Sequence, residues 1–286
     1  MFDDKTFVDD GDRRIHDEVF IQSIDRKDRL ARYLISGVGI PEADAREEAI
    51  MADILNQLIR DDNPAAAEIY EDTVIFLAEQ EEESLVPEFD TRGTRANSIY
   101  DRVKAKAYID SYWKSYNSSY PSFKSGGGDC TNFVSQMLYA GGMPWADDGN
   151  PANHRKSANW YCKPGATSKD SERRISFSWK LAALFKAHWI KRAEAHRMLS
   201  YSSALLNMNY LYKEVYIGDV VQFCYASGVP YHTLAITGFN RDPQYDVNDI
   251  VLASHDVDSN TRSLYRTMLK YPSDYKLRVY NIRKRP

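Results

Sequence analysis

The spacing of apolar residues changes along this chain, and that change limits the folds it can adopt. Through the first two-thirds, apolar residues recur mainly three or four positions apart, as on one face of a helix. In the last third, short runs alternate between apolar and polar residues, which indicates strands. A block of helices followed by a block of strands predicts an α+β fold.

Several predicted helices begin or end at residues that favour such positions. Pro41 suits a first helical turn, where its missing N–H costs nothing, and Asn63 followed by Pro64 indicates another helix start. Gly141 and Gly142 would end the helix that begins at Cys130. We expect helices over residues 13–35, 41–58, 63–77, 95–116, 130–139 and 179–199. We expect strands over residues 219–225, 232–237, 249–255 and 275–282.

The charge is divided unevenly between two parts of the chain. Residues 1–90 contain 25 Asp and Glu against 9 Lys and Arg, whereas residues 91–286 contain 16 and 28. We therefore expect two domains, an acidic helical segment (cap or lid) over 1–92 and a larger domain over 93–286. Mutual attraction and packing of the two parts is the favoured explanation. The alternative is that the basic part receives an acidic ligand, such as a carrier protein.

Composition excludes several classes of protein. The chain has no apolar run near the roughly 20 residues that a membrane span needs, and its start lacks the basic and apolar regions of a secretory signal. We expect a cytoplasmic protein without membrane or nucleic-acid partners, because basic residues cluster only at Arg283–Arg285. The three cysteines form no C-x-x-C pair, so we expect free thiols, no zinc site and no cofactor.

One of these cysteines lies in a run that is unusual for a core residue. Gly126–Gln136 reads G-G-G-D-C-T-N-F-V-S-Q, and Cys130 would occupy the first turn of a helix capped by Asp129. The helix dipole at that position lowers a thiol pKa, and glycines let the backbone approach a reacting centre. We interpret Cys130 as a nucleophile in preference to a buried structural cysteine.

A thiolate nucleophile needs a base, and His232 is the best candidate because it opens a predicted strand that could face the helix start. His255 and Asp256 end the next predicted strand, and either could orient His232. Three of the other histidines lie on predicted helices among charged residues, where we expect them at the surface: His16, His188 and His196. His154 lies in a polar loop.

The ordered blocks Y-D-R-V-K-A-K-A-Y, G-G-D-C-T-N-F-V-S-Q-M-L-Y-A-G-G, I-G-D-V-V-Q-F, Y-H-T-L-A-I-T-G and A-S-H-D-V-D resemble the bacterial putative amidase domain family. That family is grouped with papain-like cysteine peptidases, related to NlpC-type and CHAP-type enzymes. The resemblance covers about residues 96–286. It implies a papain-like fold, in which a nucleophile helix packs on an antiparallel sheet.

The resemblance also implies roles for particular residues. Cys130 would be the nucleophile and His232 the base, with Asp256 preferred over His255 as the third member. The oxyanion would be held by the backbone N–H of Cys130 and an upstream side chain. Tyr120 is preferred there over Asn117, although turn and packing roles are as plausible for both.

The chemistry we expect is acyl transfer through a thioester at Cys130. If water receives the acyl group, the protein is an amidase or peptidase; if an amine does, it is an amide synthase drawing on a carrier-bound thioester in natural-product assembly. A third reading is a catalytically inactive binding module. Aromatic residues could line the site for a peptide or acyl chain, although core packing is the commoner role: Trp145, Trp160, Tyr161 and Trp179.

Overall fold

The computed structural model describes residues 25–47, 95–124, 129–168 and 173–283, together with residues 51, 54, 55, 69, 73 and 76. The chain divides into two compact units, with the described residues up to 76 in one and those from 95 in the other. The predicted domain boundary at residue 92, the predicted helix start at Asn63 and the glycines Gly126–Gly128 lie outside the described residues.

The described part of the first unit is helical, as its apolar spacing predicts. A helix over residues 25–33 continues as a π-helical turn, Leu34–Val38, and ends at Gly39, whose φ of 83° is in the left-handed region that glycine tolerates. Helix α2 (Glu42–Arg46) follows directly after Pro41. The buried core of this unit consists of Leu30, Ala31, Leu34, Ala45, Met51, Leu55, Ile69 and Phe76.

The second unit is built on a six-stranded sheet in which every neighbouring pair is antiparallel. The strand order is β1-β6-β2-β3-β4-β5, so β3 lies inside the sheet and β1 and β5 are its edges. The strands are β1 (Ala195–Ser200), β2 (Val220–Cys224), β3 (Pro230–Asp242), β4 (Val247–Ser254), β5 (Ser259–Ser263) and β6 (Lys276–Asn281).

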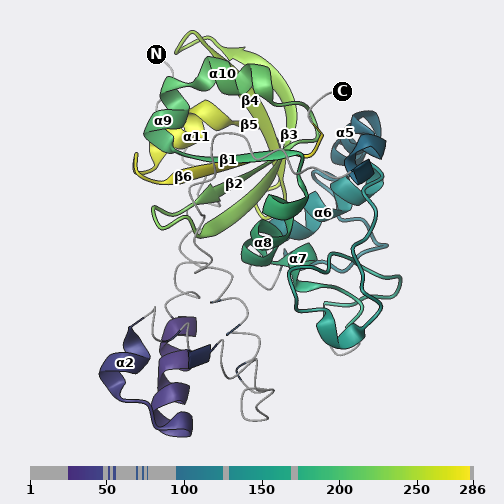
Figure 1. Cartoon of the computed structure of the whole chain (residues 1–286). Helices are drawn as coiled ribbons and strands as arrows, with labels where there is room; N and C mark the ends of the chain where they lie inside the picture. The colour runs from purple at the N-terminus through teal and green to yellow at the C-terminus, as the bar shows by residue number, and fades with distance from the viewer. Residues whose placement is uncertain are drawn as a thin grey trace. The chain divides into compact units, whose positions relative to one another are not determined.

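Helices cover both faces of this sheet (Figure 1). One face carries α6 (Cys130–Ala140), α7 (Phe177–Lys180) and α8 (Ala182–Arg192), with α5 (Arg102–Tyr112) beside α6. The other face carries α9 (Tyr201–Leu206), α10 (Met208–Glu214) and α11 (Leu264–Lys270). The described residues of this unit also include two short 3₁₀ helices, Arg95–Ile99 and Pro151–Asn153. None of the helices in the described ranges is long and apolar enough to cross a membrane.

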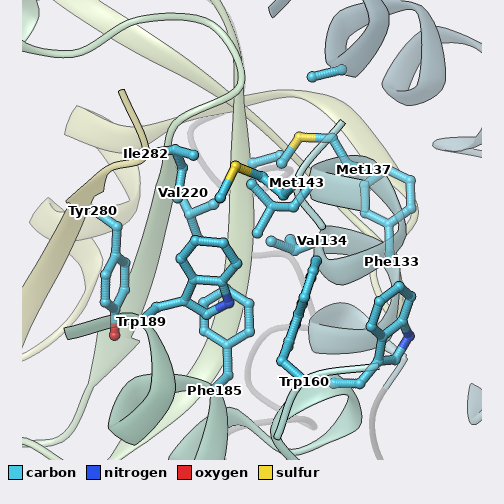
Figure 2. Close-up of a cluster of buried hydrophobic side chains, with 14 of the residues drawn as sticks. Phe133, Val134, Met137, Met143, Trp160, Phe185, Trp189, Val220, Tyr280 and Ile282 are labelled. Atoms are coloured by element: carbon cyan, nitrogen blue, oxygen red, sulfur yellow. The ribbon is translucent and has the colours of Figure 1, made fainter. Parts of the chain in front are cut away.

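Large aromatic side chains fill the space between the sheet and α6 to α8 (Figure 2). Trp189 of α8 lies edge-on to Trp160 with ring centroids 5.2 Å apart, and Phe185 lies edge-on to Tyr280 of β6 at 5.9 Å. Val134 and other apolar side chains of α6 pack into the same cluster. This apolar contact fixes α6 on the sheet, because burying such side chains contributes about 1.5–3 kcal/mol each.

The α+β prediction is confirmed, and β2, β3, β4 and β6 lie where alternation predicts strands. The predicted helix over 95–116 is shorter, since Asp101 caps a helix that begins at Arg102 by accepting the N–H groups of Val103 and Lys104. The predicted helix over 179–199 is wrong at its end, where the chain forms β1 and pairs with β6.

Candidate functional site

The site is built around the first turn of α6, which begins at Cys130 as the sequence predicts. Four successive residues there are almost fully buried although three of them are polar: Asp129, Cys130, Thr131 and Asn132. Buried polar groups need partners within the protein. The partners of these four define the site.

Asp129 does not cap α6 with its side chain, contrary to the sequence-based prediction. Its Oδ1 accepts hydrogen bonds from the backbone N–H of Phe123 and the side-chain amide of Asn132, both at 2.8 Å. Its Oδ2 lies 2.7 Å from Nδ1 of His255. Asp129 therefore ties the incoming loop and the end of β4 to the start of the helix.

The cap comes instead from Asp256, two residues after β4. Its Oδ2 accepts the backbone N–H of Cys130 at 2.8 Å and also that of Asp129. These N–H groups lie at the positive end of the helix dipole, which favours a negative oxygen. The backbone of Asp256 has a φ of 76°, a left-handed conformation that Asp and Asn adopt more readily than most residues.

His255 is held on both sides of its ring. Nδ1 faces Asp129, and Nε2 donates to the backbone carbonyl of Tyr112 at 2.7 Å. The ring stacks on Phe133 at 4.2 Å and lies 4.3 Å from the Tyr116 ring. Nε2 is the donor in its bond, because a carbonyl oxygen only accepts, and both ring nitrogens are engaged with oxygen atoms.

The Cys130 thiol is not activated in this arrangement. Burial raises its pKa to about 12, and the negative charge of Asp256 acts in the same direction. The backbone N–H of Thr233 and the groups of Thr131 act the other way, with the Thr131 hydroxyl 3.8 Å from the sulfur. Burial therefore acts against the lowering of this pKa that the position at the helix start predicts.

A buried chain of hydrogen bonds anchors the turn to the sheet. The hydroxyls of Thr131 and Thr233 are 2.9 Å apart, and Gln222 donates to Thr233 at 3.0 Å. The Tyr280 hydroxyl donates to the side-chain oxygen Oε1 of Gln222 at 2.6 Å. On the other side of the turn, Asn132 accepts the indole N–H of Trp179 at 3.0 Å. These contacts fix the position of Cys130 relative to β3.

His232 lies near the start of β3, directly before the residue whose backbone N–H bonds the Cys130 sulfur, Thr233. The Thr233 hydroxyl points towards Thr131 of α6. The His232 ring is buried against Phe223 of β2, with ring centroids 6.4 Å apart. Its pKa lies well below the usual 6.5 because the ring is buried, with Arg262 as a second cause. Of the predicted partners, the structure brings Asp256 and His255 to the start of α6.

The predicted oxyanion side chains have structural contacts. Asn117 forms a turn in which its Oδ1 accepts the N–H of Ser119, and its amide donates to the Tyr108 hydroxyl at 3.3 Å. Tyr120 stacks on Trp179 with centroids 6.0 Å apart, and partial burial raises the pKa of its hydroxyl to about 12. These are the turn and packing roles that the sequence left open for both residues.

Three of the four aromatic residues predicted to line the site are fully buried: Trp160, Tyr161 and Trp179. Trp160 and Trp179 pack on each other at 4.7 Å, and Trp145 is half-buried against Tyr139 at 5.2 Å. Core packing therefore accounts for their contacts. His188 and His196, which were expected at the surface, are also buried, as is His154, while His16 lies outside the described residues.

Sequence reasoning missed the roles of Thr131, Asn132 and Thr233, and it gave Asp129 the wrong partner. The available signal was a run of polar residues, D-C-T-N, at the start of an otherwise apolar helix. Across the described ranges, no three His, Cys, Asp or Glu side chains cluster as metal ligands would.

A comparison with known families finds a match over most of the second unit. The family described as "Putative amidase domain" matches residues 99–280, a range that includes Cys130, Asp129, His255 and Asp256. The chain belongs to this family. Amide-bond hydrolysis is therefore the general activity to which the family description points.

Among curated proteins, the chain is similar to the uncharacterized protein YhbB of Bacillus subtilis, with 30% identity over 126 residues. That match covers 44% of this chain and 32% of YhbB, so the chain spans about a third of this relative. No solved structure matches the chain.

Proposed function

We propose that this member of the amidase family cleaves amide bonds through a thioester at Cys130. The observation that carries the proposal is the pair of backbone N–H groups, of Asp129 and Cys130, that hold a negatively charged oxygen beside the thiol. The tetrahedral intermediate of acyl transfer needs such a pair of donors for its oxyanion. In the structure the oxygen belongs to Asp256.

The reaction balances as two acyl transfers. The thiolate of Cys130 attacks the amide carbonyl carbon, a carbon–sulfur bond forms, and the carbon–nitrogen bond then breaks as the amine leaves with a proton. Water attacks the thioester, loses a proton and releases the carboxylic acid, and the thiol regains its hydrogen. The sum is amide plus water giving acid plus amine.

The papain-like relationship belongs to the same proposal. A cysteine in the first turn of a helix that packs on an antiparallel sheet is the arrangement that this relationship implies, and α6 has it. The third residue in that scheme would come from the end of the strand after the histidine strand, where Asp256 and His255 lie. His232 is the proton acceptor in that scheme, and it directly precedes Thr233, whose backbone N–H bonds the Cys130 thiol.

The acyl group can pass to water or to an amine, and an assay can distinguish these two acceptors. Hydrolysis is favoured by the family description, whereas an amide synthase would use a peptide amine or similar acceptor and a carrier-bound thioester. Adding an amine to the assay distinguishes the two, since a synthase releases an amide in place of an acid.

p-Nitrophenyl acetate is a suitable first probe, because it acylates an activated thiol without needing a particular amide substrate. We expect intact mass and peptide mapping to place one acetyl group on Cys130, and nitrophenol release to be lost in Cys130→Ala. Cys162→Ala is the matched control, since Cys162 is 4% exposed against 5% for Cys130 and burial raises its pKa to about 12 as well. Unchanged turnover in Cys130→Ala would refute the proposed function.

A further inference from the structure

We propose that Gln222 is a positioning residue, which acts through Thr233 to turn the Thr131 hydroxyl hydrogen towards the Cys130 sulfur. This inference rests on the proposed function, and it adds a residue of β2 to the groups that prepare the nucleophile. Three buried side chains follow one another from the sheet to the sulfur and form the Gln222 network: Gln222, Thr233 and Thr131.

The orientation of the Gln222 side-chain amide follows from a backbone carbonyl. The atom that faces the Ala182 carbonyl oxygen, at 3.0 Å, must be the nitrogen Nε2, because a carbonyl oxygen only accepts hydrogen bonds. On the other side, Oε1 accepts the Tyr280 hydroxyl. Nε2 carries two hydrogens, of which Ala182 takes one. The second is therefore donated to the Thr233 hydroxyl oxygen, also at 3.0 Å.

The direction of the next two bonds follows from the first. Thr233 accepts from Gln222, so its own hydroxyl hydrogen needs another acceptor, and the Thr131 oxygen lies 2.9 Å away. Thr131 then accepts from Thr233 and directs its one hydrogen to the Cys130 sulfur, 3.8 Å from its oxygen. The opposite order would leave the Thr233 hydrogen buried without an acceptor in the described part of the chain.

This direction matters for the ionisation of the thiol. Burial is the largest influence on the pKa of Cys130, which it raises to about 12, and the Asp256 charge acts in the same sense. Three donors oppose it, namely the backbone N–H groups of Thr233 and Thr131 and the Thr131 hydroxyl. Donors stabilise a thiolate more than a thiol, because hydrogen bonds to a charged acceptor are stronger. No proton moves along the Gln222 network, since each hydroxyl keeps its own hydrogen.

The charged and titratable groups around the thiol come from other positions. Asp256 follows β4 and bonds the Cys130 N–H, and Asp129 at the start of α6 is paired with His255. His232 directly precedes Thr233 on β3. A substitution of Gln222 or of the Thr131 hydroxyl leaves these groups in the protein. A change in thiol reactivity then reports the hydrogen bonds of the network.

Gln222→Glu is the variant that should reverse the network. Glu has the same shape as Gln, but it carries at most one hydrogen where the amide has two. An ionised Glu accepts from Thr233, and a protonated Glu uses its hydrogen on the Ala182 carbonyl and again accepts from Thr233. Thr233 can then no longer donate to Thr131. The Thr131 hydrogen turns to Thr233 and is lost to the sulfur.

Two further comparisons control for burial and shape. Gln136→Glu is the matched control, because Gln136 is also a buried residue whose Oε1 accepts a tyrosine hydroxyl, that of Tyr108. Thr131→Val removes the last hydroxyl and keeps the side-chain shape, whereas Thr131→Ser keeps the hydroxyl. The assay is alkylation of the full chain by iodoacetamide between pH 7 and about 9, the range in which ordinary thiols ionise. Peptide mapping separates Cys130 from the other thiols.

We expect alkylation of Cys130 at pH 8 to become about three- to tenfold slower in Gln222→Glu and in Thr131→Val, because loss of a donor raises the thiol pKa. Thr131→Ser and Gln136→Glu should stay within about twofold of wild type, since the donor remains. The first release of nitrophenol from p-nitrophenyl acetate should slow by the same factor. A merely loosened fold would have the opposite effect, because exposure of a buried thiol speeds its alkylation.

Each contrary result overturns the inference. Unchanged or faster alkylation in Gln222→Glu would show that Gln222 does not direct the Thr131 hydroxyl. Alkylation as slow in Thr131→Ser as in Thr131→Val would assign the effect to packing. This second comparison decides the direction of the last bond even if Gln222→Glu fails to fold. Nitrophenol release that persists in Cys130→Ala would refute the proposed function separately, because alkylation of the wild-type thiol does not depend on turnover.

Discussion

Replacing Asp256 with Asn should make the folded protein more stable at neutral pH. Burial raises the pKa of Asp256 from 3.8 to about 6, so the folded protein favours the protonated carboxyl. Each pKa unit corresponds to about 1.4 kcal/mol, which gives a cost of about 3 kcal/mol for holding the ionised carboxylate at pH 7.

The sign of the pH dependence follows from the direction of that shift. Below pH 4 the carboxyl is protonated in both the folded and the unfolded chain, so its stabilising contribution is fully present. As pH rises from 4 through 6, the unfolded chain loses its proton first, and the free energy of unfolding falls. Asn is neutral throughout, so the advantage of Asp256→Asn grows from under about 1 kcal/mol at pH 4 to about 3 kcal/mol at pH 7.

Urea unfolding of wild type and variant at pH 4, 5, 6 and 7 measures this difference, provided that the m-value stays constant. Other buried carboxyls such as Asp219 and Asp249 titrate in both proteins and cancel in the comparison. Asp258→Asn should show no such pH-dependent gain. An advantage that stays flat from pH 4 to 7, or a variant less stable than wild type at pH 7, would refute the reasoning.

Three further predictions concern stability and are read by thermal or urea unfolding. Gly141→Ala should lower the free energy of unfolding by about 1–3 kcal/mol, because an added Cβ would overlap the Tyr100 ring. Unchanged stability would contradict this packing. Arg102→Met should lower the free energy of unfolding by about 3–5 kcal/mol, since it leaves the fully buried Asp219 carboxylate without its ion pair at 2.9 Å. An equally stable variant would show that Asp219 is neutral. His255→Ala should lower the free energy of unfolding by about 2–4 kcal/mol, because it opens a cavity and leaves one Asp129 oxygen without its partner. It should also expose Cys130 to faster alkylation. A stable variant with an unreactive thiol would contradict the positioning role of His255.

Local patterns in the sequence predicted the elements that carry the site but not the contacts between them. The start of α6 at Cys130 and its end at Gly141 follow from local residues. The bond between Asp129 and His255 joins residues 126 positions apart, and no local pattern in either segment indicates the other as its partner. β5 escaped prediction because its sequence, S-N-T-R-S, is almost wholly polar.

The burial of β3 shows why the sequence could not orient the side chains of this strand. From Pro230 to Thr237 every residue is buried, because helices cover both faces of the sheet. A strand buried on both sides has no alternation from which to decide whether His232 or Thr233 faces α6. The contact between the hydroxyls of Thr233 and Thr131 could therefore not be predicted from the strand's own sequence.

The separation in sequence between Cys130 and Asp256 has a consequence for the protein during its synthesis. The nucleophile leaves the ribosome 126 residues before the carboxylate that bonds it, and before all six strands of the sheet. A nascent chain that ends before Asp256 therefore lacks the carboxylate that accepts the N–H groups of Asp129 and Cys130. The start of α6 gains this cap only after the end of β4 has been synthesised.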